Sequence, residues 1–170
     1  IEPLSSVSKE EFKPYGQIFG VADEPPFEER EDFQYYRENI VLGPAKEEVE
    51  EVTTGLFIVH RLFPGQPLTK LERHPTFTET FIPYHGSPIV FGLAPTDNSK
   101  PGPDLERFRF FVVDDHLSIH LHKGTWHWPP MPVGGSATIM LLAKGKLFSP
   151  TNPLSATDIV DLDCRLFPVL

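Results

Sequence analysis

Short strand-like segments follow one another from Gly55 to the end of the chain, and this succession limits the fold more than any other feature. Turn signals such as Pro64-Gly65, Pro101-Gly102-Pro103 and Gly134-Gly135 separate runs of branched and aromatic residues. No long helical pattern lies between them, so the sequence predicts an antiparallel β-barrel or sandwich. The expected strands are Gly55–Phe63, Glu79–Tyr84, Pro88–Ala94, Phe108–Val113, Leu117–His122, Ala137–Ala143 and Ile159–Phe167.

The beginning of the chain predicts one short helix. Ser8 and Glu11 have the spacing of a capping box, and Phe12 follows them directly. Pro14 prevents a long continuation. A length of 170 residues suits a single domain, 1–170. Within it, we expect the acidic residues 1–51 to pack on a barrel core formed by residues 52–170.

The acidic charge of the chain is concentrated in its first part. Of 24 acidic and 15 basic residues, 14 and 5 lie in residues 1–51, so the net charge of −9 comes from there. Nucleic acid is therefore not an expected partner, because no basic patch offers counterion release. No apolar run reaches the roughly 18 residues of a membrane span. Cys164 is the only cysteine, which excludes an intramolecular disulfide and suits a reducing cytoplasm.

Histidines gather in one segment of the sequence. His120, His122 and His127 lie within eight residues, although the chain has only seven histidines. In the predicted strand Leu117–His122, the side chains of Ser118, His120 and His122 share one face. Imidazoles on a face that is suited to burial require ligation or hydrogen bonding. This segment is therefore expected to belong to an active site.

A second segment offers carboxylates beside an imidazole. On an extended backbone, Glu72 and His74 project from the same face, and Glu79 follows in the next predicted strand. Oxygen and nitrogen donors without sulfur suit a divalent first-row metal. A surface salt-bridge set formed by Glu72, Arg73 and Lys70 is the alternative interpretation.

Both segments resemble known sequence motifs. Glu72-x-His74-x4-Glu79-x6-Gly86 resembles the first motif of the cupins, and His122-x-Gly124-x2-His127 resembles the core of the second. Over most of the chain the sequence is similar to the ureidoglycolate lyases. The segments that carry this resemblance are Glu10–Gly16, Leu71–Pro75, Thr80–Pro83, Pro103–Arg109 and His122–His127.

The chain also departs from the pattern of that family at three places. Bacterial members commonly read Asn-Tyr-His where this chain has His120-Leu121-His122. They have a second histidine at the position of Trp128, and glutamine is usual at the position of Glu79.

The resemblance implies a fold, a reaction and a metal. It implies a cupin-type barrel or sandwich, usually a homodimer, that splits (S)-ureidoglycolate into glyoxylate and urea in the breakdown of purines through allantoin. It implies a divalent metal ion, with nickel as the usual assignment, while Mn, Zn and Fe would also suit the donors. The ligands carried over by motif position are Glu72, His74, Glu79 and His127.

The remaining polar and aromatic residues receive roles from the chemistry. His122 or His120 is expected to act as general base and return the proton. A small anionic substrate requires a cation, for which Lys123 is the first choice. Further residues expected to bind substrate are Arg73, Arg109, Trp126 and Trp128, although alternation predicts that Arg73 points away from Glu72 and His74.

Two other functions fit the same sequence. A metal-dependent cupin of another reaction class, such as a sugar-acid isomerase or an Fe(II) dioxygenase, would use two histidines and a carboxylate in the same way. A non-catalytic cupin that binds a small acid is the third interpretation.

Overall fold

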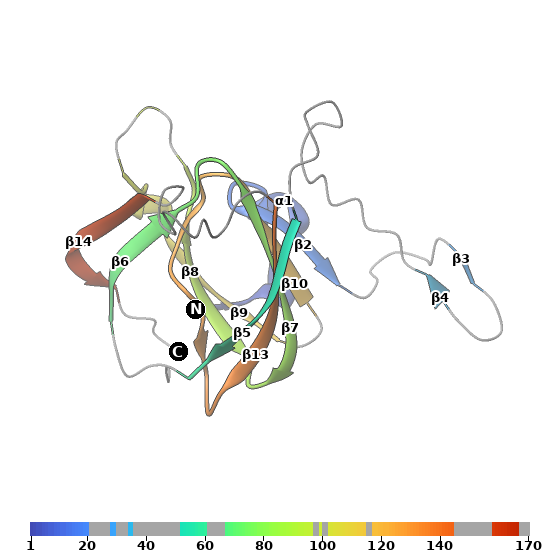
Figure 1. The fold of residues 1–170 in the computed structure, drawn as a ribbon. Helices are drawn as coiled ribbons and strands as arrows, with labels where there is room; N and C mark the ends of the chain where they lie inside the picture. The colour runs from blue at the N-terminus through green and yellow to red at the C-terminus, as the bar shows by residue number, and fades with distance from the viewer. Residues whose placement is uncertain are drawn as a thin grey trace.

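The computed structural model of the chain describes residues 1–20, 28–29, 34–35, 52–60, 67–96, 99, 102–114, 117–144 and 158–166. Within these residues the chain is mainly β, with two sheets that face each other (Figure 1). The sheets do not close into one continuous ring, so the architecture is the sandwich form of the predicted class. None of the described helices has the length and apolar character needed to cross a membrane.

The first sheet holds seven strands, of which six follow one another and β12 pairs with β8 beside them. β1 runs parallel to β9, and every other pairing within the described residues is antiparallel. In spatial order the strands are β1 (Glu2–Pro3), β9 (Arg109–Val113), β8 (Ile89–Ala94), β11 (Trp126–His127), β6 (Leu68–Arg73) and β14 (Asp158–Leu166), with β12 (Met131–Pro132) against β8.

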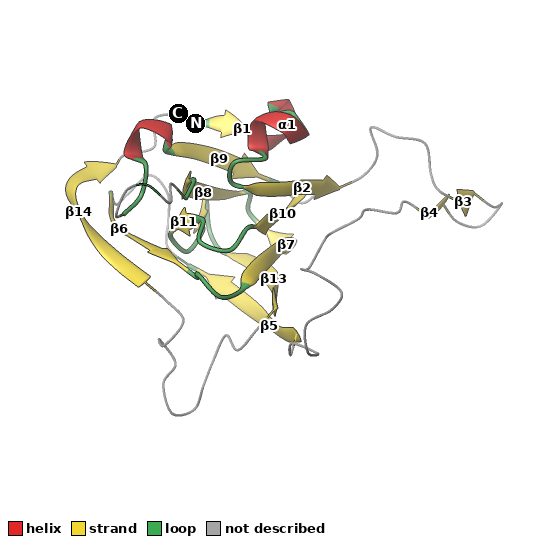
Figure 2. Ribbon diagram, turned by 90° about the horizontal axis from the view of Figure 1, so that it is seen from above, coloured by secondary structure: helices red, strands yellow, loops and turns green. Residues whose placement is uncertain are grey.

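The second sheet holds five strands. Their order is β2 (Gly16–Gly20), β10 (Leu117–Leu121), β7 (Thr78–Gly86), β13 (Ala137–Lys144) and β5 (Val52–Val59). β3 (Glu28–Glu29) and β4 (Gln34–Tyr35) form a separate pair. The short helices are η1 (Leu4–Ser6), α1 (Lys9–Phe12) and η2 (Leu105–Arg107), and Figure 2 shows α1 beside β1 and β2.

The main hydrophobic core lies between the two sheets. Alternate residues of each strand supply it: Phe91 and Leu93 come from β8, while Ile119 and Leu121 come from β10. Phe12 of α1 packs edge-on against Phe111, with ring centroids 5.1 Å apart. Because the inner face of each strand is apolar over most of its length, polar side chains on that face mark a site.

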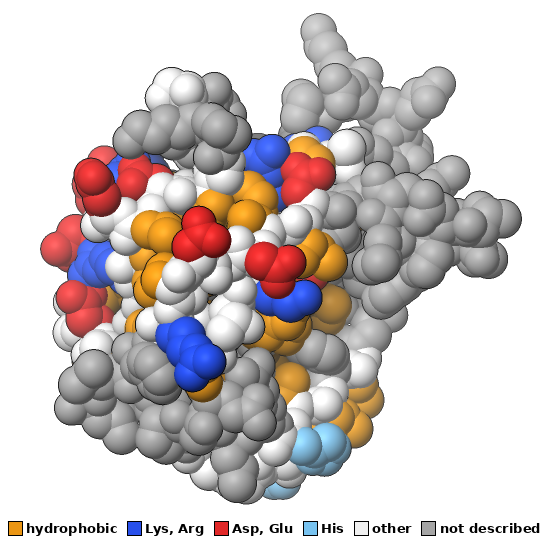
Figure 3. Space-filling model, turned by 90° about the vertical axis from the view of Figure 1, so that its left-hand side faces the viewer, with side chains coloured by type: hydrophobic (Ala, Val, Ile, Leu, Met, Phe, Trp, Pro, Cys, Tyr) orange, Lys and Arg blue, Asp and Glu red, His pale blue; other side chains and the backbone are white. Residues whose placement is uncertain are grey.

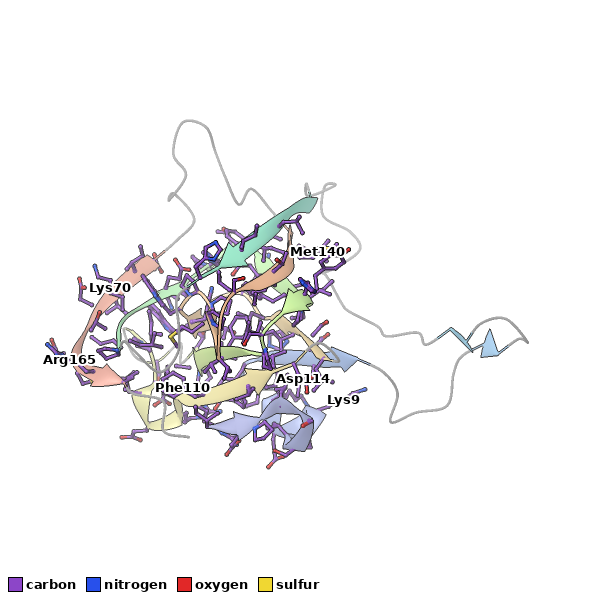
Figure 4. The ribbon with its side chains drawn as sticks, turned by 90° about the horizontal axis from the view of Figure 1, so that it is seen from below. Lys9, Lys70, Phe110, Asp114, Met140 and Arg165 are labelled. Atoms are coloured by element: carbon purple, nitrogen blue, oxygen red, sulfur yellow. The ribbon has the colours of Figure 1, made fainter. Side chains whose placement is uncertain are left out.

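A second hydrophobic cluster lies on the outer face of the first sheet. It is built on Leu68, Leu71, Val90, Ala94, Trp126 and Met131, against which residues of β14 and β9 pack. Phe110 and Met140, labelled in Figure 4, stand on the outer faces of the two different sheets. The face that carries β6 and β14 shows acidic and basic side chains among hydrophobic ones (Figure 3). Lys70 of β6 and Asp161 of β14 form an ion pair at 3.2 Å.

The local predictions at the beginning of the chain are confirmed. Ser8 caps α1, and its hydroxyl and backbone both bond with Glu11 in a capping box. Residues 1–20 also supply β1 and β2, one strand to each sheet. Most of the remaining acidic residues up to position 51 lie outside the described residues.

The strand predictions agree in place and differ in extent. The strand expected at Gly55–Phe63 runs over Val52–Val59, and residues 61–66 lie outside the described part. β2 and β6 were not among the expected strands. The hydrophobic pattern did not predict these two strands, because Gly16 in β2 and the charged residues in β6 interrupt regular alternation.

Candidate metal centre

Strand β6 directs Glu72 toward the space between the sheets. Its neighbours Leu71 and Arg73 face the outer cluster, where the guanidinium of Arg73 lies 4.7 Å from the ring centroid of Trp126. The Nε of Arg73 donates to Asp158 on β14 at 2.8 Å. Since successive side chains of a strand point to opposite faces, Glu72 points inward.

Four side chains from both sheets meet at this place. His127 of β11 pairs directly with Glu72 of β6, and His74 follows the end of β6. Glu79 comes from β7 in the opposite sheet. Phe81, two residues further along the same strand face, belongs to the main core. His74, Glu79 and His127 are 8%, 5% and 3% exposed, so the set is buried.

The donor atoms have the spacing of metal ligands. Glu72, His74 and His127 each offer one ligand atom, all within 4.8 Å of one another. The carboxylate oxygen Oε2 of Glu79 lies 3.1 Å from Nε2 of His127 and 3.3 Å from Nε2 of His74. Ligands at about 2.1 Å from one ion lie roughly 3.0 to 3.4 Å apart, so these separations fit a divalent metal.

One oxygen of the Glu79 carboxylate is left without a hydrogen bond among the described residues. Its Oε2 is buried and has no hydrogen-bond partner among the described residues, although two imidazoles lie close to it. Burial alone would raise the pKa of Glu79, but the imidazoles of His127 and His74 outweigh that effect and lower the pKa to about 2. Conversely, burial would lower the pKa of His127, but Glu79 and then Glu72 outweigh that effect, so the pKa of His127 is raised. A cation bound between this buried oxygen and the two imidazole nitrogens would give the oxygen the partner that it lacks.

The ring of His127 is held in one orientation. Its Nδ1 lies 2.9 Å from the backbone carbonyl oxygen of Thr125, which can only accept a hydrogen bond. Nδ1 therefore carries a proton, and Nε2 is the ring nitrogen that faces Glu79 and that could bind a metal after losing its own proton.

Two phenylalanines enclose the set, and the sequence pattern did not single them out. Phe77 stacks on His74 with ring centroids 4.3 Å apart, and Phe81 lies edge-on to His127 at 6.3 Å. Phe77 falls in the short loop between Glu72 and Glu79, where an apolar residue between two predicted ligands is the signal that would have identified it. Both rings are buried, so each imidazole has an apolar ring against it.

His120 lies on the other face of its strand. Ile119 and Leu121 point into the main core, so His120 between them points outward, as does Thr80 between Glu79 and Phe81. The Thr80 hydroxyl and His120 Nδ1 are 2.7 Å apart. Burial, and then the nearby His122, lower the pKa of His120 to about 4. The structure does not bring His120 to the metal-ligand set.

His122 and Lys123 lie on the turn that follows β10, and both are exposed. The next residue of this turn, Gly124, donates its backbone N–H to the carbonyl of His74 at 2.8 Å. The turn therefore borders the ligand set. Partial burial of the imidazole lowers the pKa of His122, which favours the neutral ring at neutral pH.

The other predicted substrate-binding residues are spread over the molecule. Arg109 pairs with Glu2 and lies 5.3 Å from the ring centroid of Phe111. Trp126 is buried in the outer cluster of the first sheet, and Trp128 packs at its border. These two tryptophans and Arg73 lie on the side of the sheet opposite to the ligand set.

Comparison with known proteins gives consistent matches in sequence. The family model described as ureidoglycolate lyase matches residues 1–152. A ureidoglycolate lyase from Escherichia coli O1:K1 / APEC is 30% identical over 129 residues, which cover 72% of this chain and 74% of that protein. The ureidoglycolate lyase from E. coli O139:H28 (strain E24377A / ETEC) matches to the same extent. Among solved structures, a dTDP sugar isomerase from Desulfovibrio desulfuricans G20 has a TM-score of 0.48 and 12% identity, covering 89% of this chain and 88% of that one.

Proposed function

Because this chain belongs to the ureidoglycolate lyase family, we propose that it eliminates urea from (S)-ureidoglycolate to give glyoxylate with the help of a divalent metal. The observation that carries the proposal is the convergence of Glu72, His74, Glu79 and His127 between the sheets. Nickel is the ion that the family resemblance favours, and Mn, Zn or Fe would fit the same donors.

Metal binding and substrate binding are assigned to different parts of the site. A divalent ion held by Glu72, His74, Glu79 and His127 would supply Lewis acidity toward the substrate hydroxyl. Lys123, on the exposed turn beside His74, binds the substrate carboxylate. Arg73 and Arg109 are weaker choices for that role, because Asp158 and Glu2 already pair with them.

The reaction moves one proton from oxygen to nitrogen. The substrate carbon bears a hydroxyl, a carboxylate and a urea nitrogen. Nε2 or Nδ1 of His122 takes the hydroxyl proton, the oxygen forms a carbonyl with that carbon, and the carbon–nitrogen bond breaks with its electrons on nitrogen. The same imidazole then returns the proton to the urea nitrogen. His122 is preferred over His120 because it lies beyond the end of β10, on the exposed turn beside His74, whereas His120 is buried within the strand on the outer face of the sheet.

The test is glyoxylate release from (S)-ureidoglycolate, measured after removal of metal and after addition of nickel or manganese. We expect activity only with metal, its loss in His127→Ala, and a large decrease of kcat in His122→Ala. Lys123→Ala should mainly raise KM, and His120→Ala should retain most of the activity. Full activity of metal-free protein or of His127→Ala would refute the proposal.

A second function is favoured by one specific observation. Glu72, His74 and His127 form a set of two histidines and one carboxylate, which is also the ligand set of Fe(II) oxygenases. Purified protein that contains iron and consumes oxygen with a small hydroxy or keto acid would support that function instead of the lyase. A protein that binds a small acid without turning it over would support a non-catalytic role.

We further propose that the enzyme is a cytoplasmic homodimer. Cys164 is an exposed, unpaired cysteine, which suits a reducing compartment. The outer face of the five-stranded sheet exposes Leu56 and Ile58, at 65% and 54%, and such a face suits contact with a second copy.

A further inference from the structure

The turn between β10 and β11 is held from two sides of the molecule. The backbone carbonyl of Tyr15 accepts hydrogen bonds from the Thr125 hydroxyl at 2.7 Å and from the His122 N–H at 3.3 Å. On the other side, Gly124 N–H donates to the carbonyl of His74 at 2.8 Å. The turn is closed internally by the bond from Thr125 N–H to the His122 carbonyl at 3.1 Å.

Thr125 links the Tyr15 carbonyl to the imidazole of His127. Its backbone carbonyl accepts the Nδ1–H of His127 at 2.9 Å, which orients the ring so that Nε2 faces Glu79. Its side-chain hydroxyl makes the shorter of the two bonds to Tyr15, a residue 110 positions earlier in the chain. Thr125 is 2% exposed and His127 is 3% exposed, so water does not replace either bond easily.

We infer that Thr125 is a positioning residue for His127, and that its hydroxyl holds the carbonyl which aims the imidazole at the metal. The inference rests on the proposed metal centre. Without the hydroxyl, the Tyr15 carbonyl keeps the longer bond from the His122 N–H but loses the shorter one from Thr125. The Thr125 carbonyl then has more freedom, and the His127 ring loses its fixed orientation.

The decisive variants remove or keep the hydroxyl at one position. Thr125→Val preserves the shape and deletes the hydroxyl, Thr125→Ser keeps it, and Thr125→Ala serves if the valine variant does not fold. Thr80→Val is the matched control, because it removes an equally buried hydroxyl bond, at 2.7 Å to His120, on the outer face of β7. Nickel affinity is measured by competition with a chelator, and the thermal midpoint of the metal-free protein is recorded in parallel.

We expect Thr125→Val to bind nickel about tenfold to a hundredfold more weakly, which is the usual effect of losing an outer-shell partner. Thr125→Ser should bind as the wild type does. Thr80→Val should lower the thermal midpoint but leave the affinity unchanged. A Thr125→Val affinity within twofold of wild type, or an equal loss in Thr80→Val, would overturn the inference.

A second readout separates the inference from the proposed function. Nitrogen-15 spectra of the histidine rings in metal-free protein, recorded at increasing pH until the signals of His127 no longer change, report the tautomer of its neutral ring. We expect the Nδ1–H form in wild type and a mixture of both forms in Thr125→Val. Wild type that binds no metal would refute the metal centre, while this spectrum would still decide on Thr125: an unchanged tautomer overturns its role.

Discussion

At the scale of single residues, the buried polar groups determine how the site behaves. Glu79 carries a negative charge between two imidazoles inside an apolar core, and His120 keeps a neutral ring on the outer face of the neighbouring strand. The first arrangement suits the capture of a cation, whereas the second is stable only while the ring is unprotonated. Both therefore make stability depend on charge in ways that can be measured.

Glu79→Gln should destabilise the metal-free protein at pH 7. The folded pKa of Glu79, about 2, is below the ordinary 4.5, so the charged form adds stability above pH 4.5 and loses it as the pH falls toward 2. We expect the free energy of unfolding in urea to decrease by about 2–3 kcal/mol. Glu72→Gln is the control and should cost less, because Glu72 is partly exposed and lies 3.9 Å from His127. Equal costs in the two variants would contradict this account.

His120→Gln should remove part of the acid sensitivity of the fold. The folded pKa of about 4 is below the unfolded value of 6.5, so the unfolded state takes up a proton first and stability falls between these values. Between pH 8 and pH 5 the wild type should lose about 2 kcal/mol more than the variant. His85→Gln, which replaces an exposed histidine of β7, is the matched control for losing a histidine. Parallel stability curves for wild type and His120→Gln would rule out a buried neutral His120.

At the scale of elements, the turn after β10 is the part that joins the two ligand-bearing segments. Gly124 occupies the left-handed region at φ 80°, its N–H bonds to the His74 carbonyl, and its carbonyl accepts from the Thr96 hydroxyl. A Cβ at this position would lie 2.9 Å from that hydroxyl oxygen. The turn thus requires glycine for both its backbone conformation and its close packing.

Gly124→Ala should destabilise the protein more than Gly102→Ala. Gly102 has a similar φ of 89°, but nothing lies within 4 Å of a Cβ placed there. We expect about 1 kcal/mol for Gly102→Ala from backbone strain alone, and on the order of 2 kcal/mol for Gly124→Ala from strain and crowding together. Thermal or urea unfolding measures both, and adding Thr96→Ala should recover part of the difference. Equal decreases in the free energy of unfolding would show that the contact with Thr96 does not contribute to stability.

At the scale of the whole molecule, the five-stranded sheet exposes an apolar face. β5 is its edge strand within the described residues, and Leu56 and Ile58 of β5 lie beside Met140 and Thr138 of β13. An exposed apolar face beside an edge strand favours association with another chain unless another element covers it. This is the face through which the proposed homodimer would form.

Ile58→Lys should weaken the proposed homodimer at least tenfold, as measured by sedimentation or light scattering over a range of concentrations. A lysine in a closed apolar interface would place a charge where water is excluded. Ile159→Lys is the matched control, since Ile159 is also exposed, at 48%, but lies on β14 of the other sheet. A monomeric wild type, or dissociation caused by Ile159→Lys instead, would contradict this interface.

Local patterns in the sequence determined much of what the structure contains. The capping box at Ser8 and the strands of the second half follow from local patterns, because capping and strand periodicity act over short distances. The grouping of Glu72, His74, Glu79 and His127 was expected from the resemblance to the cupin motifs, and the structure brings these four side chains together. Alternation also placed His120 and Leu121 on opposite faces of one strand. It did not indicate which face is inside, since that depends on the strands that pair with β10.

Only the tertiary structure decided that Leu121 faces the core and that His120 faces away from the ligand set. It also brought the carbonyl of Tyr15 to the hydroxyl of Thr125, and so supplied the anchor of His127. Contacts between residues this far apart in the chain depend on the packing of two sheets, and no periodicity in the sequence encodes them. The residue types of the candidate metal centre could therefore be predicted from the sequence, whereas their orientation depends on the fold.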